Sequence, residues 1–187
     1  MISYSELEKG IRIILDGQPY EIIEATPSFK ARGHSVLQTK LKNFKTGNVI
    51  SKTFHPSDSF EQAEISKKQA KFIYTYRDKY VFSEKDDSSQ RFELTKEKIG
   101  EKSKFLSPKQ IVELIIFKDE IINLSLPIKI NLKVIEAPPG EKGNRAEAGT
   151  KTVVLEGGAK ISAPLFIKQG DVLEINTETG EYIRRVE

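Results

Sequence analysis

Apolar residues in the first third of the chain fall in short β-type runs separated by turn residues. Runs of this kind cover residues 11–15, 20–24 and 49–54, and short apolar runs bounded by turn signals predict strands. Asp16-Gly17 separates the first two runs and is a strong signal for a two-residue hairpin. Residues 55–59 contain Pro56 and predict an irregular exit. About five short strands in some 60 residues predict a small barrel.

The middle third repeats this pattern and adds one helix. Residues 95–106 predict a helix, which Gly100 interrupts and therefore shortens. Strands are expected at 72–76, 80–82, 91–94, 111–117 and 121–126. Phe72, Tyr74 and Tyr76 would project from one strand face, and nucleobases can stack on such a platform. Core packing explains the same alternation without a ligand, so we expect these rings in the core.

The last third begins near Pro127 and is again built from short β-type runs. Strands are expected at 130–134, 152–155, 159–161, 172–176 and 182–186, with turns at 157–158 and 179–180. The predicted fold class is all-β, with three small barrels in a row covering residues 1–63, 64–127 and 128–187. For the second and third barrels, an oligonucleotide-binding (OB) fold is one common solution.

Composition narrows the function classes. Of 187 residues, 37% are hydrophobic and 30% are charged, which is typical of soluble proteins. No apolar run is long enough to span a membrane, and the N-terminus lacks a basic region followed by an apolar one. No cysteine is present, so disulfides and thiolate chemistry are excluded. A reducing cytoplasm is the expected location.

The net charge of +3 conceals a local excess of positive charge. No Asp or Glu occurs from Ala25 to Ser57, and residues 28–43 predict two strands around a tip at 30–34. A compact positive patch attracts phosphate whatever the charge elsewhere. The alternative is an edge hairpin whose lysines block aggregation. The basic residues of this window are Lys30, Arg32, Lys40, Lys42, Lys45 and Lys52.

Catalytic chemistry has little support in the sequence. His34 and His55 are the two histidines, and neither has the spacing of a metal site or a triad, so both are expected in solvated loops. Carboxylates are scattered as on exposed strand faces. We assign no catalytic residue, metal ligand or cofactor, and a hydrolase with a carboxylate site stays the alternative from another class.

Ordered sequence blocks along nearly the whole chain resemble the bacterial elongation factor P family. The blocks are residues 14–20, the basic hairpin with Lys40-Leu41-Lys42-Asn43, residues 52–54, 157–164, 170–171 and 176–186. The resemblance implies an SH3-like, KOW-type N-terminal barrel followed by two OB barrels. It also implies a monomeric ribosome factor that binds between the peptidyl-tRNA and exit sites and promotes peptide-bond formation at consecutive prolines. The related archaeal and eukaryotic factor normally has two domains, so three barrels argue against that branch.

Alignment on the Lys40–Lys42 block places Arg32 where many family members carry a modified lysine. The chain is thus similar to the arginine branch, whose tip is rhamnosylated by a glycosyltransferase. Lys30-Ala31 replaces the usual residues before the tip, and Lys30 is a second candidate for the modified group. The implied RNA-contacting residues of this hairpin, facing ribosomal RNA and peptidyl-tRNA, are Lys30, Arg32, Gly33, His34, Lys40, Lys42 and Lys45.

The resemblance also implies a second RNA contact, in the last third of the chain. Gly143, Asn144 and Arg145 occupy the place of a family segment that usually ends Gly-Asp-Thr and approaches the mRNA codon in the exit site. The exchange removes an acid and adds a cation, which favours phosphate and changes any base contact. A divergent paralogue that binds another RNA or ribosomal state is the alternative within the family.

Overall fold

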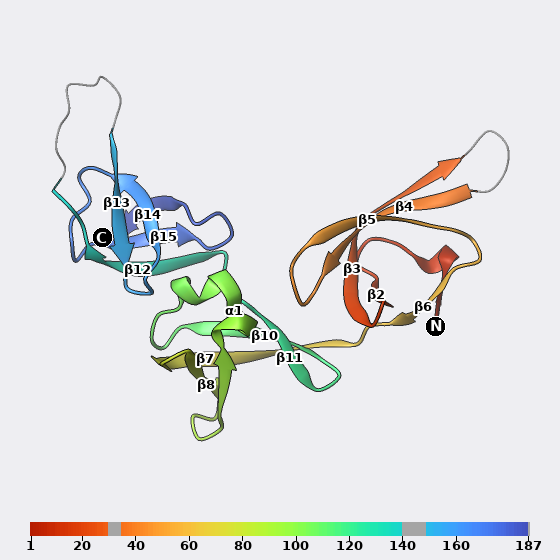
Figure 1. Cartoon of the computed structure of the whole chain (residues 1–187), viewed down its shortest axis with the longest axis horizontal. Coiled ribbons are helices and arrows are strands. Elements are labelled where there is room, and N and C mark those ends of the chain that lie inside the picture. Colours follow the sequence, from red (N-terminus) through yellow and green to blue (C-terminus); the bar gives the residue numbers. More distant parts are fainter. Residues whose placement is uncertain (30–34, 140–148, 187) are drawn as a thin grey trace. The chain divides into compact units, whose positions relative to one another are not determined.

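The computed structural model describes residues 1–29, 35–139 and 149–186, and these form three antiparallel sheets (Figure 1). By backbone proximity the chain divides into two units. The first comprises Met1–Lys68 with Leu114–Asn123, and the second comprises Gln69–Glu113 with Leu124–Glu187. The prediction of a mostly β protein with one short helix is confirmed.

The first sheet has six strands in the order β1-β6-β2-β3-β4-β5. Its core contains Ile13, Ile22 and Leu41, each fully buried, because alternate residues of β2, β3 and β4 point to one side. A one-turn 3₁₀ segment, η1 (Tyr4–Glu6), follows β1. The strands are β1 (Ile2–Ser3), β2 (Arg12–Leu15), β3 (Gln18–Phe29), β4 (Ser35–Asn43), β5 (Val49–Phe54) and β6 (Ser59–Gln62).

One turn of this sheet has the predicted geometry, and one segment differs from its prediction. Asp16 and Gly17 have φ of 52° and 75°, as a type I′ hairpin turn requires, and Leu15 pairs with Gln18. The prediction of an irregular segment over 55–59 was partly wrong, because β6 begins at Ser59. This strand pairs with β1 and β2.

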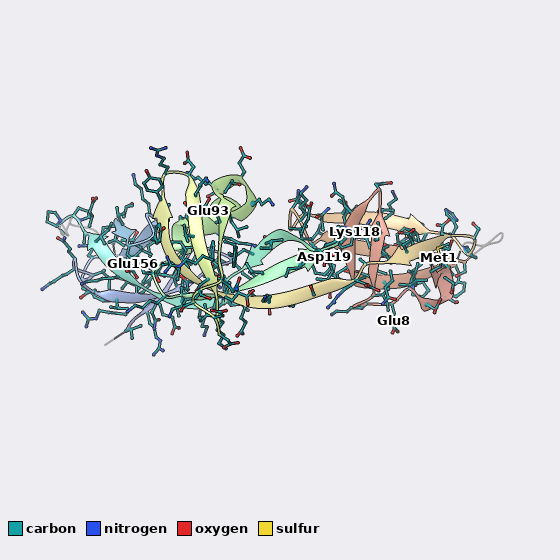
Figure 2. The ribbon with its side chains drawn as sticks, turned by 90° about the horizontal axis from the view of Figure 1, so that it is seen from below. Met1, Glu8, Glu93, Lys118, Asp119 and Glu156 are labelled. Carbon is teal, nitrogen blue, oxygen red and sulfur yellow. The ribbon has the colours of Figure 1, made fainter. Side chains whose placement is uncertain are left out.

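The second sheet has the order β11-β10-β7-β8-β9. Gly100 adopts φ +64° and ends the helix after one turn, as predicted. Lys118 and Asp119, labelled in Figure 2, both have positive φ and form the turn between β10 and β11. The elements are β7 (Ile65–Tyr76), β8 (Lys79–Glu84), β9 (Arg91–Thr95), α1 (Lys96–Ile99), the 3₁₀ segment η2 (Gly100–Phe105), β10 (Ile111–Phe117) and β11 (Glu120–Ser125).

The predicted core position is confirmed for Phe72 and was wrong for Tyr74 and Tyr76. A β-bulge lies between Phe72 and Tyr74, so the two rings lie on opposite faces of β7. Phe72 is buried, whereas Tyr74 and Tyr76 are 47% and 58% exposed. The alternation continues along β7 only up to the bulge, and the bulge reverses the face on which every later residue lies.

The third sheet has the order β14-β13-β12-β15-β16 and its own core. Phe105 of η2 lies in this core with Leu132 and Leu173. The turn between β13 and β14 approaches η2 so closely that a Cβ on Gly157 would lie 2.2 Å from the carbonyl oxygen of Lys104. The strands are β12 (Lys129–Glu136), β13 (Thr150–Leu155), β14 (Lys160–Pro164), β15 (Val172–Asn176) and β16 (Tyr182–Val186).

Candidate nucleic-acid interface

The basic hairpin is formed by β3 and β4, which pair in antiparallel register up to Phe29 and Ser35. Pairing of β3 with β2 ends near Ile22, so from Glu24 onward the only pairing described for β3 is with β4. Pro27 is tolerated there because a strand with a free edge does not need every backbone N–H. The hairpin therefore extends past the part of the sheet that contains β2.

The register of the hairpin selects which lysines face outward. Thr39, Leu41 and Asn43 of β4 are buried, whereas Lys40 and Lys42, which alternate with them, are exposed. Lys40 Nζ lies 2.6 Å from Glu24 Oε2, and both side chains are about half exposed. A bulge at the next position places Glu21 directly opposite Lys42. The window without acidic residues in the sequence thus has carboxylates beside it in space.

The turn between β4 and β5 is organised by the buried side chain of Asn43. Its Oδ1 accepts hydrogen bonds from the backbone N–H groups of Lys45 (2.7 Å) and Thr46 (3.0 Å), and its Nδ2 donates to Gln18 Oε1 (2.6 Å). Asn123 of β11 donates from Nδ2 to the carbonyl oxygens of Phe44 (2.8 Å) and Lys45 (3.2 Å). These bonds fix the backbone of Lys45, whose side chain is exposed.

The end of the described hairpin presents an exposed aromatic ring. Phe29 is 83% exposed, and its strand partner Ser35 has its Oγ 3.5 Å from the hydroxyl of Tyr4. The sequence analysis did not single out Phe29, since a Phe that ends an alternating strand is usually part of a core. An exposed ring next to a cationic tip can pack on a base or a sugar.

The structure therefore brings together three of the predicted residues, Lys40, Lys42 and Lys45, on β4 and the turn that follows it. The other predicted positions lie outside the described residues. They are Lys30, Arg32, Gly33 and His34 at the tip, and Gly143, Asn144 and Arg145 in the last third.

In the part of the chain that the structure describes, the side chains to consider as metal ligands are His55 and the carboxylates. His55 is exposed in a turn closed by Asp58, which accepts a hydrogen bond from the His55 backbone N–H at 2.8 Å. Within residues 1–29, 35–139 and 149–186, no three His, Asp or Glu side chains come together as metal ligands would. No helix in those ranges is long and apolar enough to span a membrane.

Comparison with known families covers nearly the whole chain in three consecutive matches. The model for the elongation factor P KOW-like domain matches residues 3–60, the model for its OB domain matches 65–124, and the model for its C-terminal domain matches 130–185. The chain belongs to the elongation factor P family. The fold prediction of one KOW-like domain followed by two OB domains is thereby confirmed.

Curated relatives of the elongation factor P family match the chain end to end. Elongation factor P of Desulfotalea psychrophila is 35% identical over 186 residues, covering 100% of this chain and 99% of the relative. That of Thermotoga petrophila is 39% identical over 185 residues, covering 99% of this chain and 100% of the relative. The chain is a translation elongation factor and not an enzyme, and the divergent-paralogue alternative is not favoured.

A solved structure with a similar fold is the eukaryotic translation initiation factor 5A from Methanococcus jannaschii. It matches with a TM-score of 0.50 and 17% identity, covering 67% of this chain and 90% of that chain. At this identity the likeness concerns the fold alone.

Proposed function

We propose that this protein binds the ribosome between the peptidyl-tRNA and exit sites and promotes peptide-bond formation at consecutive prolines. The observation that carries this proposal is the run of three elongation factor P domain matches along residues 3–185, together with the end-to-end match to a curated relative. Proline is a poor nucleophile because its nitrogen lies in a constrained ring. Positioning the peptidyl-tRNA is therefore the main task of such a factor.

The basic hairpin is the part of the molecule suited to this task. Arg32 is the third of the five residues that separate Phe29 from Ser35, which are strand partners. A guanidinium at that position would offer several directed hydrogen-bond donors to the end of a tRNA acceptor strand. Lys30, Gly33 and His34 flank Arg32 in the sequence and complete the proposed contact with peptidyl-tRNA.

The strands behind the tip would contact ribosomal RNA. Lys40 and Lys42 lie on one outward face of β4, and Lys45 follows on a backbone held by Asn43 and Asn123. Such cations contribute affinity that falls with salt concentration, because each phosphate contact releases counterions. We place a second contact, with the mRNA codon in the exit site, at Gly143, Asn144 and Arg145.

Arg32 is also the proposed site of covalent rhamnosylation by an arginine-modifying glycosyltransferase, with Lys30 as the second candidate. The mass of the tip peptide from protein purified from its own organism tests this point. A mass increase equal to one deoxyhexose on Arg32 is expected, and an unmodified peptide would contradict the modification without affecting the ribosome assignment. We further propose a monomer that acts in the cytoplasm, with domains at 1–63, 64–127 and 128–187.

The test of the function is the rate of synthesis through three consecutive prolines in a reconstituted translation system, with and without the protein. An otherwise identical template with three alanines serves as the control. We expect acceleration on the proline template alone. Equal rates with and without the protein on the proline template would contradict the proposal.

A further inference from the structure

The outward face of the β7-β8-β9 sheet, within the second unit, carries an exposed tyrosine pair. The bulge after Phe72 places Tyr74 opposite Val81 and Tyr76 opposite Lys79, so both rings project from the face that does not carry Phe72. Phe72, Phe82 and Leu94 are buried on the other face. On the tyrosine-bearing face, Val81 and Ser83 of β8 are also buried, so Tyr74 lies opposite a buried residue. Tyr74 and Tyr76 nevertheless remain 47% and 58% exposed and are accessible to a partner.

Basic side chains flank this tyrosine pair. Across the sheet, Tyr74 of β7 lies opposite Val81 of β8, which lies opposite Glu93 of β9. Before the bulge, Lys71 of β7 lies opposite Ser83 of β8, which lies opposite Arg91 of β9. We call the outward-facing residues Lys71, Tyr74, Tyr76, Lys79 and Arg91 the tyrosine face. The three cations of the tyrosine face lie near one carboxylate, that of Glu93, which lies opposite Val81 and pairs with Lys79 at 2.6 Å. Glu93 is labelled on β9 in Figure 2.

The geometry of the tyrosine face suits stacked bases. Tyr74 and Tyr76 are two residues apart on one strand, which corresponds to about 6.8 Å. Unpaired bases are not held at the spacing of a duplex, so each ring can take one base. The guanidinium of Arg77 lies 5.2 Å from the ring centroid of Tyr76, leaving a polarised aromatic surface with positive charge at its end.

The side chains of the tyrosine face indicate which kind of ligand it would bind. Exposed rings combined with three flanking cations complement a ligand that is both planar and anionic, which describes unpaired nucleotides. The second and third strands of OB folds are a common binding surface for oligonucleotides. In this OB domain β8 and β9 are the second and third strands and carry Lys79 and Arg91, while the two tyrosines lie beside them on β7, the first strand.

We propose that the tyrosine face is an additional RNA-binding site, at which unpaired nucleotides stack on Tyr74 and Tyr76 while Lys71 and Arg91 hold the phosphates. The choice of RNA rather than DNA rests on the proposed function. The site itself does not, because it follows from the exposure, register and charge of this sheet. The middle domain then contributes an RNA contact separate from the basic hairpin.

The test is binding of the full-length chain to a fluorescein-labelled single-stranded oligouridylate of about 12 nucleotides, followed by anisotropy at fixed salt. A fully paired RNA of the same length presents the same phosphates without accessible base faces. The double variant Tyr74→Leu with Tyr76→Leu removes both rings, and Tyr74→Phe with Tyr76→Phe keeps them. Phe166→Leu is the matched control, because Phe166 is also exposed (57%) beneath an arginine, Arg185.

We expect the leucine pair to weaken oligouridylate binding by about tenfold or more. The phenylalanine pair and Phe166→Leu should bind within about twofold of the native chain. Arg32→Ala should also keep oligouridylate binding, since it lies in the other site. Unchanged affinity in the leucine pair, equal affinity for paired and unpaired RNA, or no binding by the native chain would each overturn the proposal.

These outcomes are separable from those of the proposed function. If the chain accelerates synthesis through prolines but binds oligouridylate equally well without its two tyrosines, only the proposal for the tyrosine face is wrong. If the chain binds oligouridylate through the tyrosines but leaves the rate of proline synthesis unchanged, only the proposed function is wrong.

Discussion

Lys40 Nζ lies 2.6 Å from Glu24 Oε2, across the strand pair that supports the hairpin tip. Both side chains are about half exposed, so the pair contributes little to folding, on the order of 1 kcal/mol or less. Its main effect is on charge, because Glu24 offsets one of the cations available to phosphate. The hairpin therefore presents less positive charge than its sequence suggests.

Replacing this acid should strengthen RNA binding. Glu24→Gln is expected to raise ribosome affinity and to steepen the dependence of log affinity on log salt by about 0.7 to 0.9, the change for one added phosphate contact. Lys40→Glu and Lys42→Glu should do the opposite. Ribosome binding measured over a salt series checks both directions. A slope that does not change in Glu24→Gln would show that Lys40 does not meet a phosphate.

Asn43 should matter for stability as well as for the position of Lys45. Asn43→Ala removes two acceptor bonds and one donor bond of a buried side chain, and we expect it to lower the free energy of unfolding by about 1 to 3 kcal/mol. Asn48→Ala, at an exposed position in the same turn, should change it by less than about 0.5 kcal/mol. Urea denaturation measures both. Equal values would contradict the role of Asn43 as the organiser of this turn.

Gly157 is required by a close approach rather than by its backbone angles. A Cβ there would lie 2.2 Å from the Lys104 carbonyl oxygen, whereas one on Gly158 would meet nothing within 4 Å. Gly158 has φ +87°, so Gly158→Ala should cost about 1 kcal/mol through backbone strain alone. Gly157→Ala should cost about 3 kcal/mol through overpacking. Thermal or urea unfolding that ranks Gly158→Ala as the costlier change would contradict this contact.

The pair formed by Glu174 and Arg184 predicts a pH dependence of stability. The hydrogen bond from Arg184 (3.0 Å) lowers the pKa of Glu174 below its ordinary value of 4.5. A lowered folded-state pKa means that the stabilisation is present above 4.5 and is lost as the pH falls through the folded value. The native chain should be more stable than Glu174→Gln near neutral pH, and the difference should shrink in acid. A difference that stays constant across this range, followed by urea unfolding, would exclude the ion pair as its cause.

Local turn chemistry made much of the fold predictable. Asp16-Gly17 predicted its hairpin because these residues tolerate positive φ, and the strands at 172–176 and 182–186 match their predicted bounds. The strand Ser59–Gln62 was missed because it has one large apolar residue and depends on partners, β1 and β2, from the start of the chain. Pairing between distant segments leaves no local signal.

The candidate site also combines features that the local sequence predicts with features that it does not. Lys40 and Lys42 were named from the sequence as basic residues of the hairpin, and both are exposed on β4. Glu24 could have been found by counting strand partners outward from Arg32, since Glu24 and Lys40 are equally distant from it in the sequence. The bulge before Tyr74 had no such signal, because one extra residue changes the face of every residue after it without altering the composition.

The most direct measurement of the central claim is the rate of peptide-bond formation on three consecutive prolines with protein purified from its own organism, compared with Arg32→Ala. Asn48→Ala serves as a matched substitution in the same domain, and circular dichroism checks that each variant is folded. We predict that the native chain and Asn48→Ala accelerate synthesis and that Arg32→Ala loses most of the effect, because the proposed role of Arg32 is contact with peptidyl-tRNA and not folding. Full acceleration by folded Arg32→Ala would contradict the claim that the hairpin tip carries the function.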